Sequence, residues 1–450
     1  MSHLSVAKFG GTSVANYSAM QSCANIVIAD PNTRVVVLSA SAGVTNLLVA
    51  LANGCEEPER NKLLNEVRQI QENILTALKD DSRVRPKIEA LLANITSLAE
   101  AANLATSLAL TDELISHGEM MSSLIFVEVL RELQIEATWL DVRTIVATNS
   151  HFGKAAPNDE QTRQNCDNLL KPLIERGELV ITQGFIGRDE QGKTTTLGRG
   201  GSDYSAALLA EVLNAQDVLI WTDVAGIYTT DPRIVSNAQR IDTISFSEAA
   251  EMATFGAKVL HPATLLPAVR SNIPVYVGSS KAPQDGGTWV TRNQQPRPTF
   301  RAIALRRDQT LLTLSSLNML YAQGFLANIF TILAKHKISV DTITTSEVSV
   351  ALTLDKTGSA SSGASLLSEE LLRELSEFCT VKVDVGLSLI ALIGNELHTA
   401  SGVAKRIFET LDAYNIRMIS YGASTNNICL LADSDKADDI VRSLHRSLFE

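Results

Sequence analysis

Residues 194–204 read Thr194-Thr-Thr-Leu-Gly-Arg-Gly-Gly-Ser-Asp203-Tyr204, and an apolar run to Leu213 follows them directly. The glycines in this stretch let the backbone approach a ligand closely, because no Cβ atom stands in the way. Ser202 is a good N-cap for a helix over residues 204–213, whose first N–H groups and dipole attract anions. Arg199 adds a planar fork that suits a carboxylate or a phosphate. A plain glycine-rich turn before a helix would explain the same residues, so an anion site here needs support from elsewhere in the chain.

That support comes from the N-terminus, where Leu4-Ser-Val-Ala-Lys8-Phe-Gly10-Gly11-Thr-Ser-Val14 reads as a short apolar strand that breaks at a Gly-Gly turn. Lysine is disfavoured in a buried strand unless an anion meets it. An edge strand would also tolerate Lys8, but the neighbouring glycines and hydroxyls favour a phosphate cradle. A third strand, Val35-Val-Val-Leu38, runs into a small polar loop in the same way. Ligands bind beyond the carboxyl ends of strands in open α/β sheets, so the three loops predict a phosphoryl-handling site.

One motif is misleading. Residues 187–194, Gly187-Arg-Asp-Glu-Gln-Gly-Lys193-Thr194, satisfy the Walker A pattern. A true P-loop opens a helix directly after its Lys-Thr pair. Here three threonines and a glycine follow, which favours a strand, so we interpret the segment as a solvated hairpin tip.

The composition bounds the class of protein. At 450 residues the chain is long enough for two or three domains, and 45% hydrophobic residues can supply a substantial core. The formal charge of −11 argues against nucleic acid or an anionic membrane as the main partner. The five cysteines are widely scattered without a C-x-x-C, and no basic-plus-apolar leader or spanning segment is evident. These features fit a protein of the reducing cytoplasm best.

The order of the predicted elements divides the chain in two. Strands alternate with helical patterns to about residue 291, as a mostly parallel sheet requires, and residues 61–133 are rich in helix and read as a substrate-side subdomain. Residues 293–299 form a polar, proline-punctuated linker. No G-x-G-x-x-G opens a βα unit, so nothing suggests a fused NAD-dependent half.

Beyond the linker the chain repeats itself. The segment Gly324–Ile338 aligns without gaps with Gly402–Ile416, at a constant offset of 78 residues (402 − 324). Each copy reads as strand, helix, two strands and helix, a small α+β unit. Residues 381–385 supply a last strand to the first copy, and we expect the strand Phe300–Leu305 to complete the second. The first unit is then inserted within the second.

Two of the motifs above, together with a third stretch at residues 221–233, now gain a specific meaning. Lys8–Val14, Thr196–Asp203 and Trp221-Thr-Asp-Val-Ala-Gly-Ile-Tyr-Thr-Thr-Asp-Pro-Arg233 resemble the signatures of the aspartate kinases, members of the amino-acid kinase superfamily, and the chain most resembles their monofunctional, lysine-sensitive form. The resemblance implies an α/β amino-acid kinase domain over residues 1–292, a linker over 293–299 and a regulatory region over 300–450. That region holds nested ACT domains, the first at about 310–386 and the second at about 387–450 plus residues 300–306.

The implied reaction is transfer of the γ-phosphoryl group of ATP to the side-chain carboxylate of L-aspartate, the first step toward lysine, threonine and methionine. A carboxylate is ionised at neutral pH, so positioning and charge neutralisation matter more than a general base. We assign Lys8, with the N–H groups of Gly10 and Gly11, to the transferring phosphoryl group. Asp203 is the candidate that organises Mg²⁺ or its waters, although a helix-capping acid would look the same, and the metal ligands themselves stay unknown.

Further residues follow from the resemblance. It implies that Arg199 and Glu119 hold the substrate's α-carboxylate and α-ammonium groups, with Ser39, Thr45 and Ser202 close by. Without the resemblance, an exposed helix acid would explain Glu119. The expected ATP-binding residues are Lys8, Gly10, Gly11, Thr222, Asp223, Tyr228, Arg233 and Lys258.

The repeat alignment also points to an effector. In the alignment, Asp341 and Glu347 of the first copy are equivalent to Ile419 and Thr425 of the second. Only the first copy therefore has two acids at these positions for a ligand with two ammonium groups. Solubilising acids at exposed strand ends would look the same. The resemblance implies inhibition by L-lysine and homo-oligomers, dimers or tetramers, formed through the ACT domains. The expected lysine-binding residues are Met319, Gly324, Phe325, Leu326, Ser339, Val340, Asp341, Thr345, Ser346 and Glu347.

Two rival classes remain open. One is another member of the superfamily, such as acetylglutamate kinase or uridylate kinase, against which the tandem repeat and the pair of Arg199 and Glu119 weigh. The other is a non-catalytic amino-acid sensor on a decayed kinase fold. Retention of Lys8, Arg199 and Asp203 together argues against decay.

Overall fold

The computed structural model describes residues 3–256, 260, 265–292, 297–319, 323–355 and 367–450. Its residues group into two compact units, each described by itself below. The first comprises Met1–Ile227, Arg240–Ala250 and Lys258–Gln294, and the second comprises Tyr228–Gln239, Glu251–Ala257 and Gln295–Glu450. Two segments of the predicted first domain, 228–239 and 251–257, therefore group with the regulatory region.

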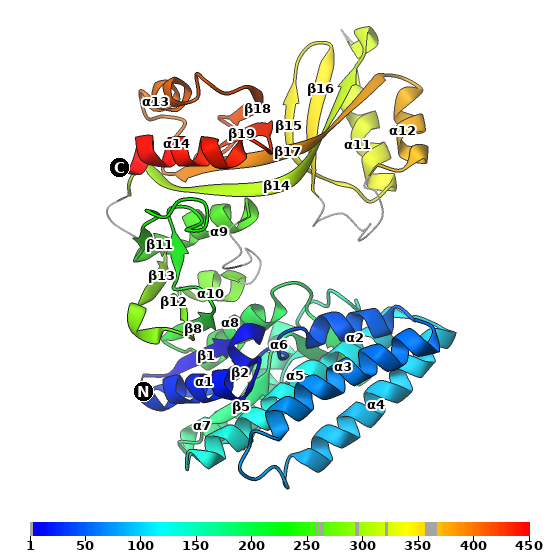
Figure 1. Ribbon diagram of the computed structural model, residues 1–450, viewed down its shortest axis with the longest axis vertical. Helices are drawn as coiled ribbons and strands as arrows, with labels where there is room; N and C mark the ends of the chain where they lie inside the picture. The colour runs from blue at the N-terminus through cyan, green and yellow to red at the C-terminus, as the bar shows by residue number, and fades with distance from the viewer. Residues whose placement is uncertain (1–2, 257–259, 261–264, 293–296, 320–322, 356–366) are drawn as a thin grey trace. The chain divides into compact units, whose positions relative to one another are not determined.

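An eight-stranded sheet forms the centre of the first unit (Figure 1), in the order β11-β13-β12-β8-β1-β2-β5-β3. Six of its seven pairings are parallel, and only β12 with β13 is antiparallel. The mostly parallel open sheet predicted from the sequence is confirmed. The strands are β1 (Ser5–Phe9), β2 (Thr33–Leu38), β3 (Thr138–Trp139), β5 (Val180–Gln183), β8 (Asp217–Thr222), β11 (Thr243–Ser245), β12 (Val275–Ser279) and β13 (Gly287–Thr291).

Shorter strands lie outside this sheet. A small sheet in the order β4-β6-β7 pairs β6 with β7 antiparallel. The shorter strands are β4 (Ala147–Thr148), β6 (Ile186–Asp189), β7 (Thr194–Thr196), β9 (Ile227–Tyr228) and β10 (Arg240–Ile241).

Helices α2, α3, α4 and α5 lie side by side (Figure 1), so the helix-rich region predicted at residues 61–133 is confirmed. The longest, α5, is buried along most of its length, and its apolar residues join the core with β1 and β2. The described helices before residue 293 are α1 (Tyr17–Ala29), α2 (Val44–Ala52), α3 (Glu57–Leu75), α4 (Arg85–Leu104), α5 (Leu108–Glu132), α6 (Asp159–Asn165), α7 (Lys171–Glu175), α8 (Gly201–Leu213), α9 (Phe246–Thr254) and α10 (Leu266–Ser271). Shorter helical turns are η1 (Gly11–Val14), η2 (Val142–Thr144), η3 (Cys166–Leu170) and η5 (Pro283–Asp285).

The second unit contains a six-stranded sheet in the order β15-β16-β14-β17-β19-β18. Its elements are β14 (Phe300–Ser315), η6 (Leu317–Met319), α11 (Phe325–Lys335), β15 (Ser339–Thr345), β16 (Ser349–Asp355), α12 (Glu369–Ser376), β17 (Thr380–Gly394), α13 (Val403–Thr410), β18 (Ile416–Tyr421), β19 (Asn427–Asp433) and α14 (Ala437–Phe449).

The strand pairing has the nested arrangement that the repeat predicts. The first part of β14, residues 300–306, pairs with residues 389–394 of β17, whereas residues 311–315 pair with residues 380–384 and with β16. The sequence suggested separate strands for the two copies. In the structure, β14 and β17 each run through both copies as one irregular strand, with shifts in register near Gln309.

The two repeat helices match in detail. Gly324 and Gly402, which are equivalent in the alignment, cap α11 and α13 with φ angles of 87° and 81°. Five residues later, Ile329 and Ile407 are both fully buried, each in the apolar cluster of its own copy.

Replacement of either isoleucine by alanine should therefore destabilise its ACT copy. We expect Ile329→Ala and Ile407→Ala each to lower the free energy of unfolding by about 2–5 kcal/mol, since each leaves a cavity. Glu409→Ala is the control, because its exposed ion pair with Lys405 stabilises little. Urea unfolding measures all three, and an Ile407→Ala variant as stable as Glu409→Ala would contradict the packing described.

Candidate active site

Lys8 and Asp203 form an ion pair at the carboxyl end of β1. The Lys8 Nζ atom lies 2.6 Å from Asp203 Oδ1, and the two side chains are only 11% and 14% exposed. Asp203 stands in the first turn of α8, where the helix dipole favours a negative charge. A cation and a helix N-terminus therefore meet at one strand end, as an anion site requires.

The start of α8 differs from the prediction. The helix begins at Gly201, and the N-cap is Gly200, whose φ of 72° is left-handed. Ser202 lies inside the first turn, so the prediction that it caps the helix was wrong. Glycine adopts the left-handed conformation without a Cβ penalty, which lets the helix start three residues earlier than predicted.

Gly10 and Gly11 lie beside this pair, but their roles differ. The Gly10 N–H donates to the carbonyl of Trp221 on β8, so the predicted donation from Gly10 to a phosphate is not available in this structure. A Cβ atom at Gly11 would lie 2.8 Å from the carbonyl oxygen of Ala40, which explains glycine at this position. The turn thus packs tightly against the loop after β2.

Glu119 faces that same loop from α5. Its Oε1 accepts a hydrogen bond from the Ala40 N–H at 3.2 Å, while its buried Oε2 makes no hydrogen bond to any described residue. Burial raises the pKa of this carboxyl to about 8. A buried acceptor without a partner is uncommon, and it suits a cationic ligand group.

Ser39 connects Glu119 to β1. Its carbonyl accepts a hydrogen bond from the Ser122 hydroxyl at 2.7 Å, and its N–H donates to the carbonyl of Phe9, the residue after Lys8. The structure thereby brings Lys8, Asp203, Ser39 and Glu119 into one region. Thr45 is half-buried in the first turn of α2, and Arg199 is exposed in the loop before α8.

Asp112 is a buried acid of this region that the sequence analysis missed. Its carboxylate accepts hydrogen bonds from the N–H groups of Gly153 and Thr196 and from the Thr196 hydroxyl, at 2.8–3.0 Å. It therefore joins α5, the helix of Glu119, to β7, the strand that leads to Arg199. One acid in an apolar helix is usually exposed, so the sequence carried no specific signal for this role.

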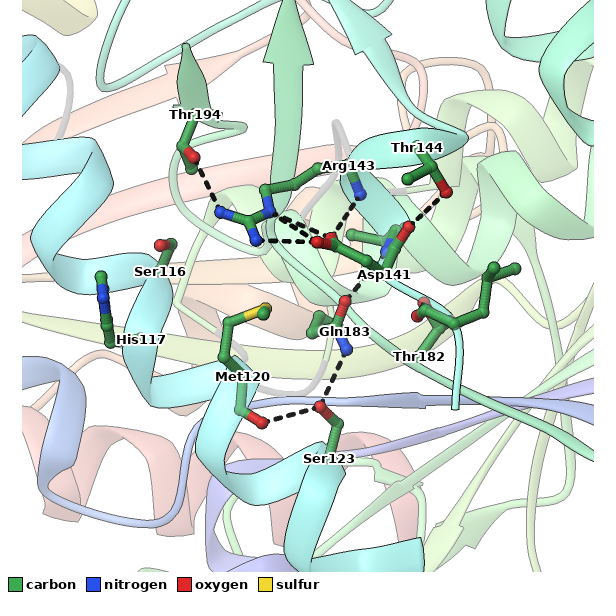
Figure 2. Close-up of polar contacts among 12 residues, drawn as sticks. Ser116, His117, Met120, Ser123, Asp141, Arg143, Thr144, Thr182, Gln183 and Thr194 are labelled. Atoms are coloured by element: carbon green, nitrogen blue, oxygen red, sulfur yellow. Dashed lines mark hydrogen bonds and ion pairs between the residues drawn. The ribbon is translucent and has the colours of Figure 1, made fainter. Parts of the chain in front are cut away.

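A second network, also missed, lies along α5 (Figure 2). Arg143 donates to Asp141 at 2.7 Å and to the Thr194 hydroxyl at 3.0 Å, which fixes the start of β7. The Gln183 side chain, at the end of β5, donates to Ser123 of α5 and accepts from the N–H of Val142, both at 2.9 Å. These contacts fix the positions of the strand ends relative to the helix.

The predicted nucleotide residues do not all lie in one unit. Thr222 ends β8 and Asp223 follows it in the first unit, where the Thr222 hydroxyl donates to Asp223 at 3.1 Å. Tyr228 and Arg233 belong to the second unit, and the exposed Arg233 guanidinium pairs with Asp231. Lys258 lies outside the described residues.

The Walker-like segment is a β-hairpin. Strands β6 and β7 pair antiparallel, and Lys193 is exposed in the turn, where its N–H donates to the Asp189 carboxylate. No helix follows Thr194, so the interpretation of the motif as a hairpin tip is confirmed.

The predicted lysine-binding residues fall into two groups within one chain. The loop after β14 contacts the β15–β16 turn, because the Ser316 N–H donates to the carbonyl of Val348, and Met319 lies three residues beyond Ser316. Thr345 ends β15, Ser346 and Glu347 follow in the turn, and Gly324, Phe325 and Leu326 lie at the start of α11. Phe325 is a core residue that packs on Phe378, so only its backbone is free for a ligand.

The second group is at the start of β15. Ser339 and Val340 are half-buried there, and Asp341 forms an ion pair with Arg306. Asp341 lies within β15, whereas Glu347 lies in the exposed bend after the strand ends at Thr345. That both acids hold one lysine ligand stays a prediction.

Three findings bear on metals, redox state and membranes. Among the described residues, no three His, Cys, Asp or Glu side chains gather as a metal-binding cluster. All five cysteines lie in the described part of the chain and are free thiols, four of them buried. None of the described helices has the length and apolar character needed to cross a bilayer.

Comparisons with known proteins identify the family of this chain. A model of the amino acid kinase family matches residues 3–279, and a model of the ACT domain matches residues 390–448. The lysine-sensitive aspartokinase 3 of Escherichia coli (strain K12) is 62% identical over 450 residues, which cover 100% of both chains. The chloroplastic aspartokinase 3 of Arabidopsis thaliana is 34% identical over 463 residues, covering 99% of this chain and 81% of the relative.

Solved structures with a similar fold come from the same group of enzymes. Crystalline E. coli aspartokinase III in complex with aspartate and ADP, described as its R-state, has a TM-score of 0.90 at 61% identity and covers 100% of both chains. The same enzyme in complex with lysine and aspartate, its T-state, has a TM-score of 0.87 and covers 99% of this chain and 100% of the other.

The fold and these matches define a kinase with an attached ACT region. The chain belongs to the amino acid kinase family and, within it, to the aspartokinases. The predicted fold class and the predicted class of enzyme are both confirmed.

Because Lys193 is in a hairpin turn, it should be dispensable for ATP. We expect Lys193→Ala to leave the KM for ATP within about threefold of wild type, as is usual for a surface substitution. Steady-state kinetics with varied ATP measures this. A large loss of ATP affinity would show that the Walker-like segment is the real phosphate site.

Proposed function

We propose that this chain transfers the γ-phosphoryl group of ATP to the side-chain carboxylate of L-aspartate and that L-lysine inhibits it. The nearly buried pair of Lys8 and Asp203 at the N-terminus of α8 is the observation that carries the proposal, because it places a cation where a phosphoryl group could bind. The related E. coli structures contain aspartate, ADP and lysine, which supports the same substrates and effector here.

The reaction needs no added base. An oxygen of the ionised aspartate carboxylate attacks the γ-phosphorus, and the bond to the bridging oxygen breaks as ADP leaves with the electron pair. Lys8 neutralises charge on the transferring group, and the Gly11 turn shapes the cradle around it. Magnesium would arrive with the nucleotide, and the single carboxylate of Asp203 suits an ion that keeps phosphate and water ligands.

The substrate's amino-acid end would meet separate residues. The unpartnered Oε2 of Glu119 suits its ammonium group, and the guanidinium of Arg199 suits its α-carboxylate. Ser39, Thr45 and Ser202 complete this side of the site. On the nucleotide side we propose Thr222, Asp223, Tyr228, Arg233 and Lys258.

The regulatory site would form between two copies of the chain. Asp341 lies within β15 and pairs with Arg306, whereas Glu347 lies in the exposed bend after that strand. We propose that two chains bring one acid each, in a homo-oligomer built through the ACT domains. The free cysteines fit a reducing compartment, and we propose the cytoplasm.

A test of the function compares phosphate acceptors. Purified chain with MgATP is given L-aspartate, N-acetylglutamate or UMP, and ADP release is followed in a coupled assay. We expect turnover with aspartate alone. Turnover with either of the other acceptors would indicate another kinase of the family, and none at all would indicate a sensor without catalysis.

The raised pKa of Glu119 predicts a pH dependence for aspartate binding. The carboxyl is mostly protonated at pH 7 in the free chain, and the substrate's ammonium should ionise it. Binding then releases a proton, so the KM for aspartate should fall as the pH rises from 6 to 8, by at most about tenfold per unit. Glu119→Gln should bind aspartate more weakly at every pH and show no such slope. A KM that is flat or rises with pH in the wild type would refute this role.

The effector assignment predicts the result of a charge reversal. Glu347→Lys should raise the lysine concentration for half-inhibition by at least about tenfold, because the ligand loses a charged partner. The kcat without lysine should stay within twofold. Glu369→Lys, the same change on exposed α12, is the control and should remain lysine-sensitive. Full lysine sensitivity of Glu347→Lys would overturn the assignment.

A further inference from the structure

The segment Tyr228–Gln239 is packed into the regulatory unit although two predicted nucleotide residues, Tyr228 and Arg233, lie on it. Its strongest anchor is Thr229, which is only 7% exposed. The Thr229 N–H donates to the carbonyl of Gln239 at 2.8 Å, and its carbonyl accepts from the N–H of Ile303 on β14 at 2.7 Å. Its backbone is thus fixed on both sides.

The hydroxyl of Thr229 also makes two hydrogen-bond contacts. It accepts a hydrogen bond from the N–H of Gln239 at 3.0 Å, and it lies 2.9 Å from Nε2 of His445 on α14. Since the hydroxyl already accepts one bond, its own proton is free to be donated to the imidazole. With Nε2 as the acceptor, a neutral ring carries its proton on Nδ1, the nitrogen nearer Glu450.

His445 is held as firmly as Thr229. Its side chain is fully buried and stacks on Phe449 with ring centroids 5.0 Å apart, and its Nδ1 lies 3.5 Å from Glu450. Burial lowers the pKa of this imidazole, which agrees with the neutral form. A buried histidine whose partner is removed would keep an unsatisfied acceptor, so the pair acts as one unit.

The same helix makes a second attachment to the segment. The Arg442 side chain donates to the carbonyl of Ile234 at 3.1 Å, and Ile234 and Val235 pack against the apolar cluster that contains Ile440 and Leu444. One face of α14 therefore contacts the segment on both sides of Arg233.

We propose that Thr229 and His445 are positioning residues for the nucleotide, through which α14 of the second ACT domain sets the conformation of the Tyr228–Arg233 segment. This inference rests on the proposed nucleotide role of Tyr228 and Arg233. A shift of α14 would then alter nucleotide affinity without any change in the residues that contact aspartate.

The test uses the full-length chain. Thr229→Val keeps the side-chain shape but removes the hydroxyl, and His445→Phe keeps the ring but removes both nitrogens. Thr229→Ser retains the hydroxyl and should rescue. The matched control is Ser443→Ala, which removes a hydrogen bond of α14 to Tyr414 in the same domain but none to the segment.

Binding of ADP with excess Mg²⁺ is measured by calorimetry, and the KM values for ATP and aspartate are measured alongside. We expect Thr229→Val and His445→Phe to weaken ADP binding and raise the KM for ATP by about three- to tenfold. Thr229→Val removes the hydroxyl's contacts with both His445 and the Gln239 N–H, whereas His445→Phe removes the contact with Thr229 and leaves the one with Gln239. The KM for aspartate should stay within twofold of wild type, and Thr229→Ser and Ser443→Ala should behave as wild type.

An ADP affinity within twofold of wild type in folded Thr229→Val would overturn the proposal, whether or not His445→Phe folds. So would an equal rise in the KM values for ATP and aspartate, because that would indicate general destabilisation. Failure of the proposed function looks different: the wild type would not phosphorylate aspartate, while the ADP measurement would still decide the role of Thr229 and His445.

Discussion

The ion pair between Lys8 and Asp203 is the contact on which the first unit depends. Lys8 projects from β1, in the middle of a parallel sheet, and a charge there would be costly without a partner. Asp203 supplies that partner from the first turn of α8, at 2.6 Å. Removing either member would leave the other as an isolated charge with little access to water. The pair therefore joins the strand to the helix N-terminus, at the strand end where we propose that a phosphoryl group binds.

The remainder of the site is built by buried polar contacts along α5. Asp112 holds β7, Ser123 holds Gln183 at the end of β5, and Glu119 holds the loop after β2. Each of these side chains faces a different strand end, so one helix sets the spacing of several loops. Of these three side chains, only Glu119 has a buried oxygen with no hydrogen-bond partner among the described residues. That difference separates a residue available to a ligand from residues that position the scaffold.

Sequence reasoning predicted the parallel sheet, the repeat and the hairpin behind the Walker-like motif, because each depends on local composition and spacing. It placed the helix start at Ser202 wrongly, since Gly200 takes a left-handed conformation that sequence alone does not reveal. It could not decide whether Asp341 and Glu347 serve one ligand, because an alignment of repeats gives positions but no distances between side chains. Asp112 and Arg143 carried no motif, and their roles depend on contacts between residues far apart in the chain. The domain assignment of residues 228–239 is likewise set by packing of Thr229 on His445.

The most direct test of the account is the turnover of a Lys8→Ala variant. Its kcat should fall by about a hundredfold or more, as is typical when a charge that stabilises the transition state is removed. Binding of aspartate should persist in calorimetry, because Glu119 and Arg199 are unchanged, and circular dichroism should show an intact fold. A folded Lys8→Ala variant with near-normal kcat would contradict the central claim that this ion pair forms the phosphoryl-transfer site.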